Sequence, residues 1–161
     1  MGHPESTFLL PGQLLFSTED HRVTTILGSC VSVVIHDRRR HFGGLCHYLL
    51  PAGAPAPGAQ TRYGNLAIPL LLDRFFEAGS RAADLAVAVV GGGLLMDADS
   101  FFFVGDRNVA LAKEVLAPYA FASVAWDCGG PLGRKITFRT SSGHLDVRLL
   151  RRTLNVNRDH I

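Results

Sequence analysis

The segment from Cys30 to Pro51 constrains the fold more than any other part of this sequence. It contains two apolar runs, "CVSVVIH" and "FGGLCHYLLP", separated by the strongly charged "DRRRH". Apolar runs of strand length on either side of a short polar connection are typical of an antiparallel β-hairpin. We therefore expect the two runs to pair as neighbouring strands, with the charged residues in the turn.

The pairing register decides which side chains meet across this hairpin. A two-residue turn at 38–39 pairs His36 with His41 and, further along, places Cys30 directly opposite His47. Directly opposed residues of an antiparallel pair point to the same face, with Cβ atoms about 4.5 to 5.5 Å apart. A bulge at either glycine of "FGGL" would change the register. The opposition of cysteine and histidine is therefore a hypothesis that depends on a regular ladder.

A cysteine beside a histidine has two interpretations. An imidazole accepts the proton of a thiol and later donates it to a leaving amine, so Cys30 and His47 are candidates for nucleophile and general base. Free cysteine is also among the most buried residue types, and His47 is equally compatible with a hydrogen-bonded core histidine. Cys46 and Cys128 lack a clear partner in the sequence, so we interpret them as packing residues. The residues alone leave both interpretations of the pair open.

A third polar group usually orients the imidazole of such a pair. The nearest candidates in the sequence are Thr24, Thr25 and Ser29. Thr24 reaches the site only if the chain turns before the cysteine, and Gly28 permits such a turn. The backbone N–H groups of Gly28 and Ser29 are candidate donors to a tetrahedral oxyanion, or to the substrate.

The remaining patterns predict an α+β fold, a sandwich of mixed or antiparallel strands with two main helices. Strands are expected on both sides of the Pro-Gly turn in "FLLPGQLLFS", and at "VTTILGS", "LAVAVV", "FASVAWD", "KITF" and "LDVRLL". One helix is expected from a cap at Asn65, with Pro69 in its first turn, to a stop at Gly79. A second is expected from a cap at Asp106 to Pro118. "PAGAPAPGAQ" predicts a surface loop, and the glycines of "GGGLLM" predict a close approach of two backbones.

The totals limit the classes of function. With 161 residues, 47% apolar and 19% charged, the chain fits one domain, with a core at about 11–150 and peripheral tails. A net charge of +2 and the lack of a long apolar run predict neither nucleic-acid binding nor membrane insertion. Three cysteines without a recognisable secretory leader favour a reducing, cytoplasmic location. No spacing typical of a metal or phosphate motif is present, so we expect no cofactor.

Five blocks in order give the sequence a family resemblance: "LGSCVSVVIHD", "GGLCHYLLP", "RYGNLAIPLLL", "GDRN" and "DCGGPLGRKITF". Together they resemble the chemoreceptor glutamine deamidase family, CheD, from about Pro11 to about Leu150. The resemblance implies a fold related to the catalytic domain of cytotoxic necrotizing factor. It implies hydrolysis of glutamine side-chain amides on the cytoplasmic helices of a chemoreceptor, through a cysteine thioester, in chemotaxis signalling. For some members it also implies a receptor methylesterase activity and docking to the phosphatase CheC, so a CheC-binding module with little enzymatic activity is the alternative.

The resemblance also assigns roles to residues. The family's nucleophile follows L-G-S and corresponds to Cys30, and its general base precedes the apolar "LP" ending and corresponds to His47. A threonine six residues before the cysteine corresponds to Thr24, which is therefore expected to orient His47. Asp106 stands where the family more often has glutamate, and the two further cysteines also depart from the pattern. None of these departures removes a catalytic group.

Overall fold

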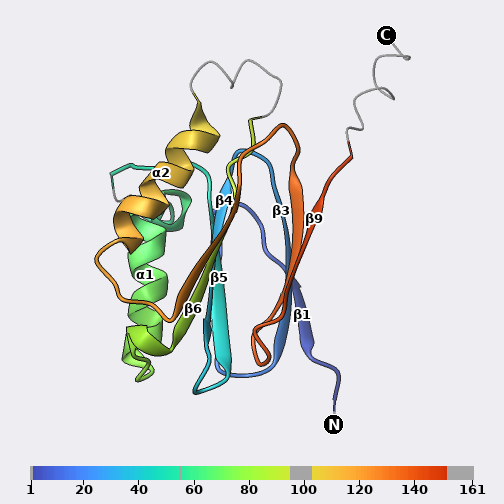
Figure 1. Cartoon of the computed structure of the whole chain (residues 1–161), viewed down its shortest axis with the longest axis vertical. Helices are drawn as coiled ribbons and strands as arrows, with labels where there is room; N and C mark the ends of the chain where they lie inside the picture. Colours follow the sequence, from blue (N-terminus) through green and yellow to red (C-terminus); the bar gives the residue numbers. More distant parts are fainter. Residues whose placement is uncertain (1, 55, 95–102, 152–161) are drawn as a thin grey trace.

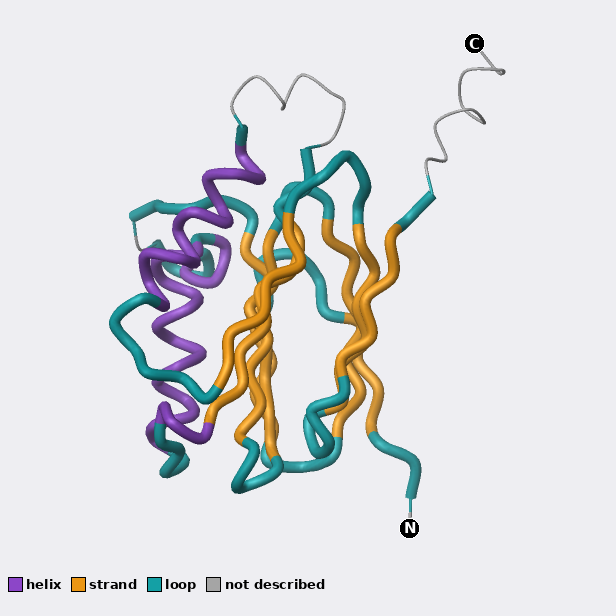
Figure 2. Tube along the Cα trace, in the orientation of Figure 1, coloured by secondary structure: helices purple, strands orange, loops and turns teal. Residues whose placement is uncertain are grey.

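The chain folds into three layers, with the helices on one side, a five-stranded sheet in the middle and a four-stranded sheet on the other side (Figure 1, Figure 2). The structure is a computed structural model that describes residues 2–54, 56–94 and 103–151. The four-stranded sheet has the order β1 (Glu5–Phe8), β3 (His21–Leu27), β8 (Arg134–Arg139), β9 (Leu145–Leu149). The five-stranded sheet has the order β2 (Leu14–Ser17), β5 (Phe42–Tyr48), β4 (Val31–Asp37), β6 (Leu85–Gly91), β7 (Ser123–Cys128). The helices are α1 (Gly64–Glu77) and α2 (Val104–Leu116), with short 3₁₀ turns at Gln60–Arg62 and Ala82–Asp84.

Both sheets contain parallel and antiparallel neighbours. β1 is parallel to β3 and β6 is parallel to β7, whereas the other neighbouring strands are antiparallel. The expected α+β sandwich with two main helices is confirmed, and the predicted strands are present, although β1 includes only Phe8 of the apolar run before the Pro-Gly turn. In the parts of the chain that the structure describes, neither helix is long and apolar enough to cross a membrane.

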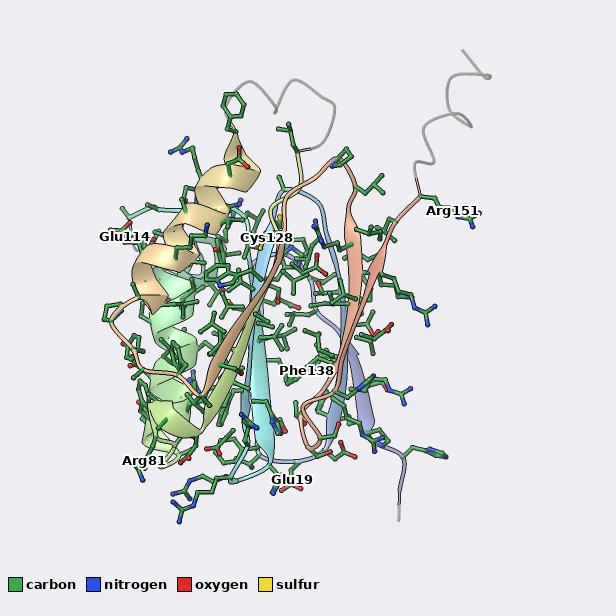
Figure 3. The ribbon with its side chains drawn as sticks, viewed as in Figure 1. Glu19, Arg81, Glu114, Cys128, Phe138 and Arg151 are labelled. Carbon is green, nitrogen blue, oxygen red and sulfur yellow. The ribbon has the colours of Figure 1, made fainter. Side chains whose placement is uncertain are left out.

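The core lies on both faces of the central strand β4, which is buried along its whole length. Val33 and Ile35 pack in the cluster beneath the helices. Val34 points the other way and packs with Phe138, which lies between the two sheets (Figure 3). Burial on both faces explains why "CVSVVIH" is an almost continuous apolar run rather than an alternating one.

The β4–β5 hairpin forms as expected, but the predicted register is wrong by two residues. His36 pairs with Gly43, and Ser32 rather than Cys30 lies directly opposite His47. A shift of two residues preserves the alternation of side chains along a strand, so the cysteine keeps its expected face. It becomes a diagonal neighbour of the histidine, a separation of about 7 to 8 Å that side chains still span.

The turn of this hairpin is longer than the sequence suggested because a buried carboxylate holds it. Asp37 accepts the backbone N–H groups of Arg39 at 2.9 Å and Arg40 at 2.8 Å, and the hydroxyl of Ser80 donates to the same carboxylate. His41 closes the turn with φ of 60°, in the left-handed region. The turn therefore occupies 38–41 instead of 38–39.

Helix α1 begins one residue before its predicted cap. Asn65 lies inside the helix, and its side-chain oxygen accepts the N–H of Gly53 at 3.3 Å instead of capping the helix. Pro69 consequently lies beyond the first turn, within the helix. The predicted stop is confirmed, because the helix ends at Glu77 and Gly79 has φ of +94°.

Helix α2 also begins before its predicted cap. It starts at Val104, after Phe103 with φ of 50°, and Asp106 lies in its first turn without a capping hydrogen bond. A carboxylate in the first turn still interacts favourably with the positive end of the helix dipole. The helix ends at Leu116, shortly before Pro118, as expected.

Candidate functional site

Cys30 lies at the end of the β3–β4 connection and is half-buried. Its side chain packs against the apolar cluster between the two sheets, the side to which Val34 of the same strand region also points. The thiol thus sits at the mouth of the inter-sheet space rather than on the helix side of the sheet. A half-buried thiol at this position is accessible to a substrate and partly shielded from water.

Gly91, the last residue of β6, and the two glycines that follow it fix the backbone of the β3–β4 connection. Gly92 donates its N–H to the carbonyl oxygen of Cys30, and Gly93 donates to that of Gly28, each at 2.9 Å. A Cβ on Gly91 would lie 2.3 Å from the Cys30 carbonyl oxygen, and φ at Gly91 is +115°. Only glycine combines this approach with this backbone conformation. The expected close approach of two backbones at "GGG" is confirmed.

Asn108 of helix α2 links the β3–β4 connection, which carries Cys30, to the residue that follows β5, the strand of His47. Its side-chain nitrogen donates to the carbonyl oxygen of Ser29 at 3.0 Å and to that of Leu49 at 2.9 Å. The hydroxyl of Tyr48 donates to the Asn108 carbonyl oxygen at 2.5 Å. Asn108 is fully buried, and its two donor protons join the chain just before the cysteine to the chain just after the histidine. Sequence reasoning did not find this residue, although it lies in the "GDRN" block.

The imidazole of His47 is buried and held by a threonine hydroxyl. Thr25 Oγ1 lies 2.7 Å from His47 Nδ1 and donates its proton to the carbonyl oxygen of Leu9, also at 2.7 Å. A hydroxyl has one proton to donate, so Thr25 must accept the N–H of Nδ1. This fixes the tautomer, and the lone pair of His47 is on Nε2. Among the described residues, Nε2 has no hydrogen-bond partner.

The N-terminal loop between β1 and β2 positions the backbone of the same histidine. Gly12 donates its N–H to the His47 carbonyl oxygen at 2.8 Å, and the His47 N–H donates to the carbonyl oxygen of Gln13 at 3.0 Å. With the contact from Thr25 to Leu9, this loop makes three contacts with the histidine and its threonine. Sequence reasoning recognised only a Pro-Gly turn here.

The predicted orienting residue, Thr24, is not beside the histidine. Its side chain lies on the other face of β3, where its hydroxyl is 3.4 Å from that of Thr137. Val23, Thr25 and Leu27 are the buried residues of this strand. The alternation V-x-T-x-L in the sequence was the signal that Thr25, and not Thr24, faces the core.

Burial shifts both members of the pair toward their neutral forms. It raises the pKa of the Cys30 thiol, an effect only partly opposed by the residue's own backbone N–H at the sulfur. It lowers the pKa of His47 to about 4. At neutral pH the resting pair is therefore a thiol and a neutral imidazole with an available Nε2, which is the protonation state that a general base requires.

The other two cysteines have different surroundings. Cys46 is fully buried on the helix side of β5, and burial raises its pKa to about 12. Cys128, at the upper end of β7 in Figure 3, donates its S–H to the carbonyl oxygen of Val89 at 3.3 Å. Both contribute to packing on the helix side of the sheet.

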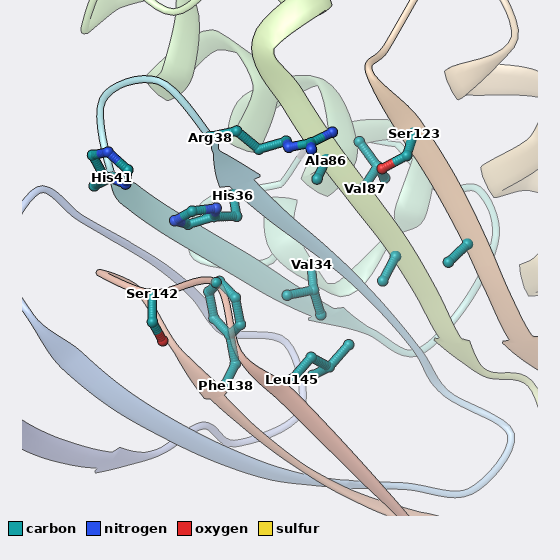
Figure 4. A pocket seen from close by; sticks show the side chains of 13 residues that line it. Val34, His36, Arg38, His41, Ala86, Val87, Ser123, Phe138, Ser142 and Leu145 are labelled. Carbon is teal, nitrogen blue, oxygen red and sulfur yellow. The ribbon is translucent and has the colours of Figure 1, made fainter.

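A groove of about 450 Å³ opens at the opposite end of β4 from Cys30. His36, Arg38 and His41 lie along one side of it, and Phe138 and Leu145 form part of its apolar floor (Figure 4). Because it lies at the far end of the strand, this groove is separate from the thiol and imidazole.

The fold and the site define a class of protein: an α+β sandwich with a half-buried thiol and a buried, oriented imidazole at one end of its central strands. A family model described as CheD chemotactic sensory transduction matches residues 49–149. The chain belongs to the CheD family. It is 38% identical to the probable chemoreceptor glutamine deamidase CheD of Trichlorobacter lovleyi, over 84% of this chain and 85% of that protein. The matched range of the family model begins after Cys30 and His47, so these two residues rest on the geometry described above.

Two further relatives carry similar names. The probable chemoreceptor glutamine deamidase CheD 2 of Geobacter sulfurreducens is 38% identical, over 94% of this chain and 95% of that protein. The probable chemoreceptor glutamine deamidase CheD of Thiobacillus denitrificans is 33% identical, over 94% of this chain and 77% of that protein. The similarity thus extends over most of the chain.

Proposed function

We propose that this protein is a cytoplasmic deamidase that converts glutamine side chains of chemoreceptors to glutamate and releases ammonia. Membership of the CheD family supports the activity, because the relatives named above are chemoreceptor glutamine deamidases by name. One observation carries the chemistry: the tautomer of His47 is fixed so that an unpartnered Nε2 lies on the same face of the sheet as Cys30.

The first half-reaction forms a thioester. Cys30 Sγ forms a bond to the amide carbon while its proton passes to His47 Nε2, and the carbonyl electron pair moves to the oxygen. When the tetrahedral intermediate collapses, the C–N bond breaks and Nε2–H gives its proton to the departing nitrogen, which leaves as ammonia. The lowered pKa of His47 favours this return of the proton.

The second half-reaction releases glutamate. A water molecule adds to the thioester carbon while His47 Nε2 accepts one of its protons, and the C–S bond then breaks. The departing thiolate of Cys30 recovers the proton from the imidazolium. The enzyme thus returns to its neutral pair, and the net reaction is hydrolysis of one amide. A receptor methyl ester would pass through the same thioester with methanol as the leaving group.

Two supporting roles follow from the local geometry. Thr25 orients His47, since it is the hydroxyl that accepts the Nδ1 proton. The backbone N–H of Cys30 belongs to the same residue as the thiol and is therefore near the carbon that the sulfur attacks. This N–H, with those of Ser29 and Gly28 in the same connection, is our proposal for the donors to the oxyanion.

The surroundings of the site suit a protein substrate. Leu10, Leu50 and Leu94 are 52%, 42% and 40% exposed. Leu10 is close in sequence to Gly12, which is hydrogen-bonded to His47, and Leu50 follows Leu49, which is hydrogen-bonded to Asn108. Leu94 follows Gly93, which is hydrogen-bonded to the β3–β4 connection. Exposed apolar side chains around a site are typical of surfaces that bind another protein. We propose that they contact the helical hairpin of the receptor.

The test is the intact mass of a chemoreceptor cytoplasmic fragment after incubation with the protein. The mass should rise by about one unit for each glutamine converted to glutamate. Cys30→Ala and His47→Ala should abolish this gain, and Cys128→Ala, which removes a thiol from the helix side of the sheet, should leave it unchanged. A folded wild-type protein that alters no receptor glutamine would contradict the proposal.

The family resemblance implies a second role, docking to the phosphatase CheC. Failure of the protein to deamidate any receptor would favour this role. The same exposed leucines would then be the binding surface. Direct binding of purified CheC, with Leu50→Ser as the variant that weakens it, distinguishes the two roles. If the wild-type protein deamidates a receptor, deamidation is its main role.

A further inference from the structure

Three buried side-chain atoms have no hydrogen-bond partner among the described residues: Ser32 Oγ, His47 Nε2 and Asn108 Oδ1. Ser32 is 0% exposed and His47 is 1% exposed. Buried hydroxyls and ring nitrogens are nearly always hydrogen-bonded in folded proteins, and each exception calls for an explanation. Two of these three side chains, Ser32 and His47, are direct neighbours.

The strand register places these two side chains together. Ser32 on β4 lies directly opposite His47 on β5. Directly opposed residues share a face of the sheet, with Cβ atoms about 4.5 to 5.5 Å apart. On its other side Ser32 pairs with Val90 of β6, whose side chain offers no hydrogen bond. Of the two side chains directly opposite Ser32, only that of His47 is polar.

The position relative to Cys30 is equally specific. Cys30 precedes Ser32 by two residues and packs against the same inter-sheet cluster, so both side chains point to the same side. Cys30 lies at the mouth and is half-buried, whereas Ser32 lies one step further inside. A group held between Ser32 and His47 would thus approach the thiol from the interior of the sandwich. Two polar partners at this spacing suit one bridging water molecule.

We propose that Ser32 and His47 hold the water that hydrolyses the thioester, a role that rests on the proposed function. The water donates one hydrogen bond to His47 Nε2 and makes its second hydrogen bond to the Ser32 hydroxyl. Its oxygen forms the new bond to the thioester carbon, its proton passes to Nε2, and the C–S bond breaks with the electron pair returning to Cys30. The remaining oxygen and hydrogen become part of the product carboxyl group.

An interior water has a clear advantage for an enzyme with a protein substrate. A docked receptor helix covers the mouth and excludes solvent while the acyl group is attached to Cys30. Once ammonia has left, Nε2 is neutral again and accepts a hydrogen bond from the water that Ser32 holds beside it. Ser32 is a positioning residue in this scheme, since it acts through the water, and it takes no part in forming the thioester.

The test compares formation of the thioester with its hydrolysis in the variant Ser32→Ala. Release of the first ammonia should stay within about twofold of wild type, whereas kcat should fall by about tenfold, as expected for one lost hydrogen bond to the attacking water. KM should fall by the same factor, leaving kcat/KM unchanged, because acylation is intact. Intact-mass analysis of acid-quenched samples should show enzyme joined to substrate with the loss of one ammonia.

Two further variants keep the result specific. Thr140→Val removes another buried hydroxyl, which lies outside the hairpin and accepts the N–H of His21 at 2.8 Å, and it should change neither kcat nor KM. Ser32→Thr retains a hydroxyl and should recover part of kcat. An unchanged kcat in folded Ser32→Ala, or an equal fall in kcat and kcat/KM, would overturn the proposal. A wild-type protein that releases no ammonia at all would instead overturn the proposed function.

Discussion

Two buried histidines of the β4–β5 hairpin differ in the surroundings of one ring nitrogen, and this difference distinguishes a packing residue from a candidate base. His36 on β4 and His47 on β5 lie at opposite ends of the strand pair, and burial lowers the pKa of both. Each also has one ring nitrogen in a hydrogen bond. His47 Nδ1 is bonded to Thr25, and His36 Nε2 donates to the carbonyl oxygen of Ser141 at 3.2 Å.

The difference lies in the surroundings of the second nitrogen. His36 Nδ1 is packed against Gly143, where a Cβ would lie only 2.5 Å away. His47 Nε2 instead faces the side of the sheet on which Cys30 and Ser32 lie. Burial and a lowered pKa are therefore common to both residues. His47 is the candidate base because the lone pair on its Nε2 is on the side of the sheet that carries Cys30.

The sharpest test of this comparison replaces each histidine by glutamine, which retains hydrogen-bonding atoms without a titrating ring. His47→Gln should reduce the deamidation rate by about 10² to 10⁴-fold, because the general base is lost. His36→Gln should leave the rate of the folded protein within about twofold, because its end of the hairpin holds no reacting group. Initial rates of ammonia release measure both. Equal losses in the two variants would contradict the distinction drawn here.

A smaller effect is expected for the two adjacent threonines of β3. Thr25→Val should lower kcat by about 10-fold to 100-fold, since Nδ1 would lose its partner and the ring its fixed tautomer. Thr24→Val should have little effect on kcat, because Thr24 faces Thr137 on the other side of the strand. Steady-state kinetics of both variants, with circular dichroism to verify folding, decides between them. A larger loss in Thr24→Val would support the assignment from family spacing.

The smallest change in rate is expected from mild acid. The pKa of His47 is about 4, so at pH 5 about nine-tenths of the base stays neutral, compared with about 3% for a histidine of pKa 6.5. The rate should therefore fall by less than about twofold between pH 6.5 and pH 5. A pH profile of kcat/KM on the free enzyme measures this. An acid limb centred near pH 6.5 would show that His47 is not the titrating base.

The same shift has a consequence for folding, whose sign is fixed by linkage. The folded-state pKa of about 4 lies below the ordinary 6.5, so between these values the unfolded chain binds more protons than the folded one. The free energy of unfolding therefore decreases as the pH falls through this window, by about 3 kcal/mol in total. Urea unfolding of wild type and His47→Gln at pH 7 and pH 4.5 should show that the variant loses less stability.

Patterns along the chain predicted much of the fold and part of the site. Alternation and apolar runs were enough for the strands, both helices and the β4–β5 hairpin. The register was not predictable, because the turn length depends on the burial of Asp37 beneath Ser80, a contact between distant residues. Helix starts were misplaced because neither helix has a side-chain cap, so the polar residues at Asn65 and Asp106 gave a false signal.

At the site, residue chemistry and the family blocks predicted Cys30 and His47, and the two side chains share a face of the sheet as expected. Family spacing predicted Thr24 for the orienting role, whereas the hydroxyl beside His47 belongs to Thr25, as the alternation of buried residues along β3 indicates. Asn108 and Ser32 were not identified at all. Their roles depend on carbonyl groups and on a pairing register that only the tertiary structure defines.

The contacts that hold the β3–β4 connection and the threonine beside His47 join residues that are far apart in the chain. Cys30 depends on Gly92, Ser29 depends on Asn108, and Thr25 depends on Leu9. A nascent chain that has emerged only as far as β5 already carries both thiol and imidazole, yet Gly92, Gly93 and Asn108, which hold the β3–β4 connection, have still to be synthesised. Activity should therefore appear only after α2 has been synthesised and has docked on the sheet.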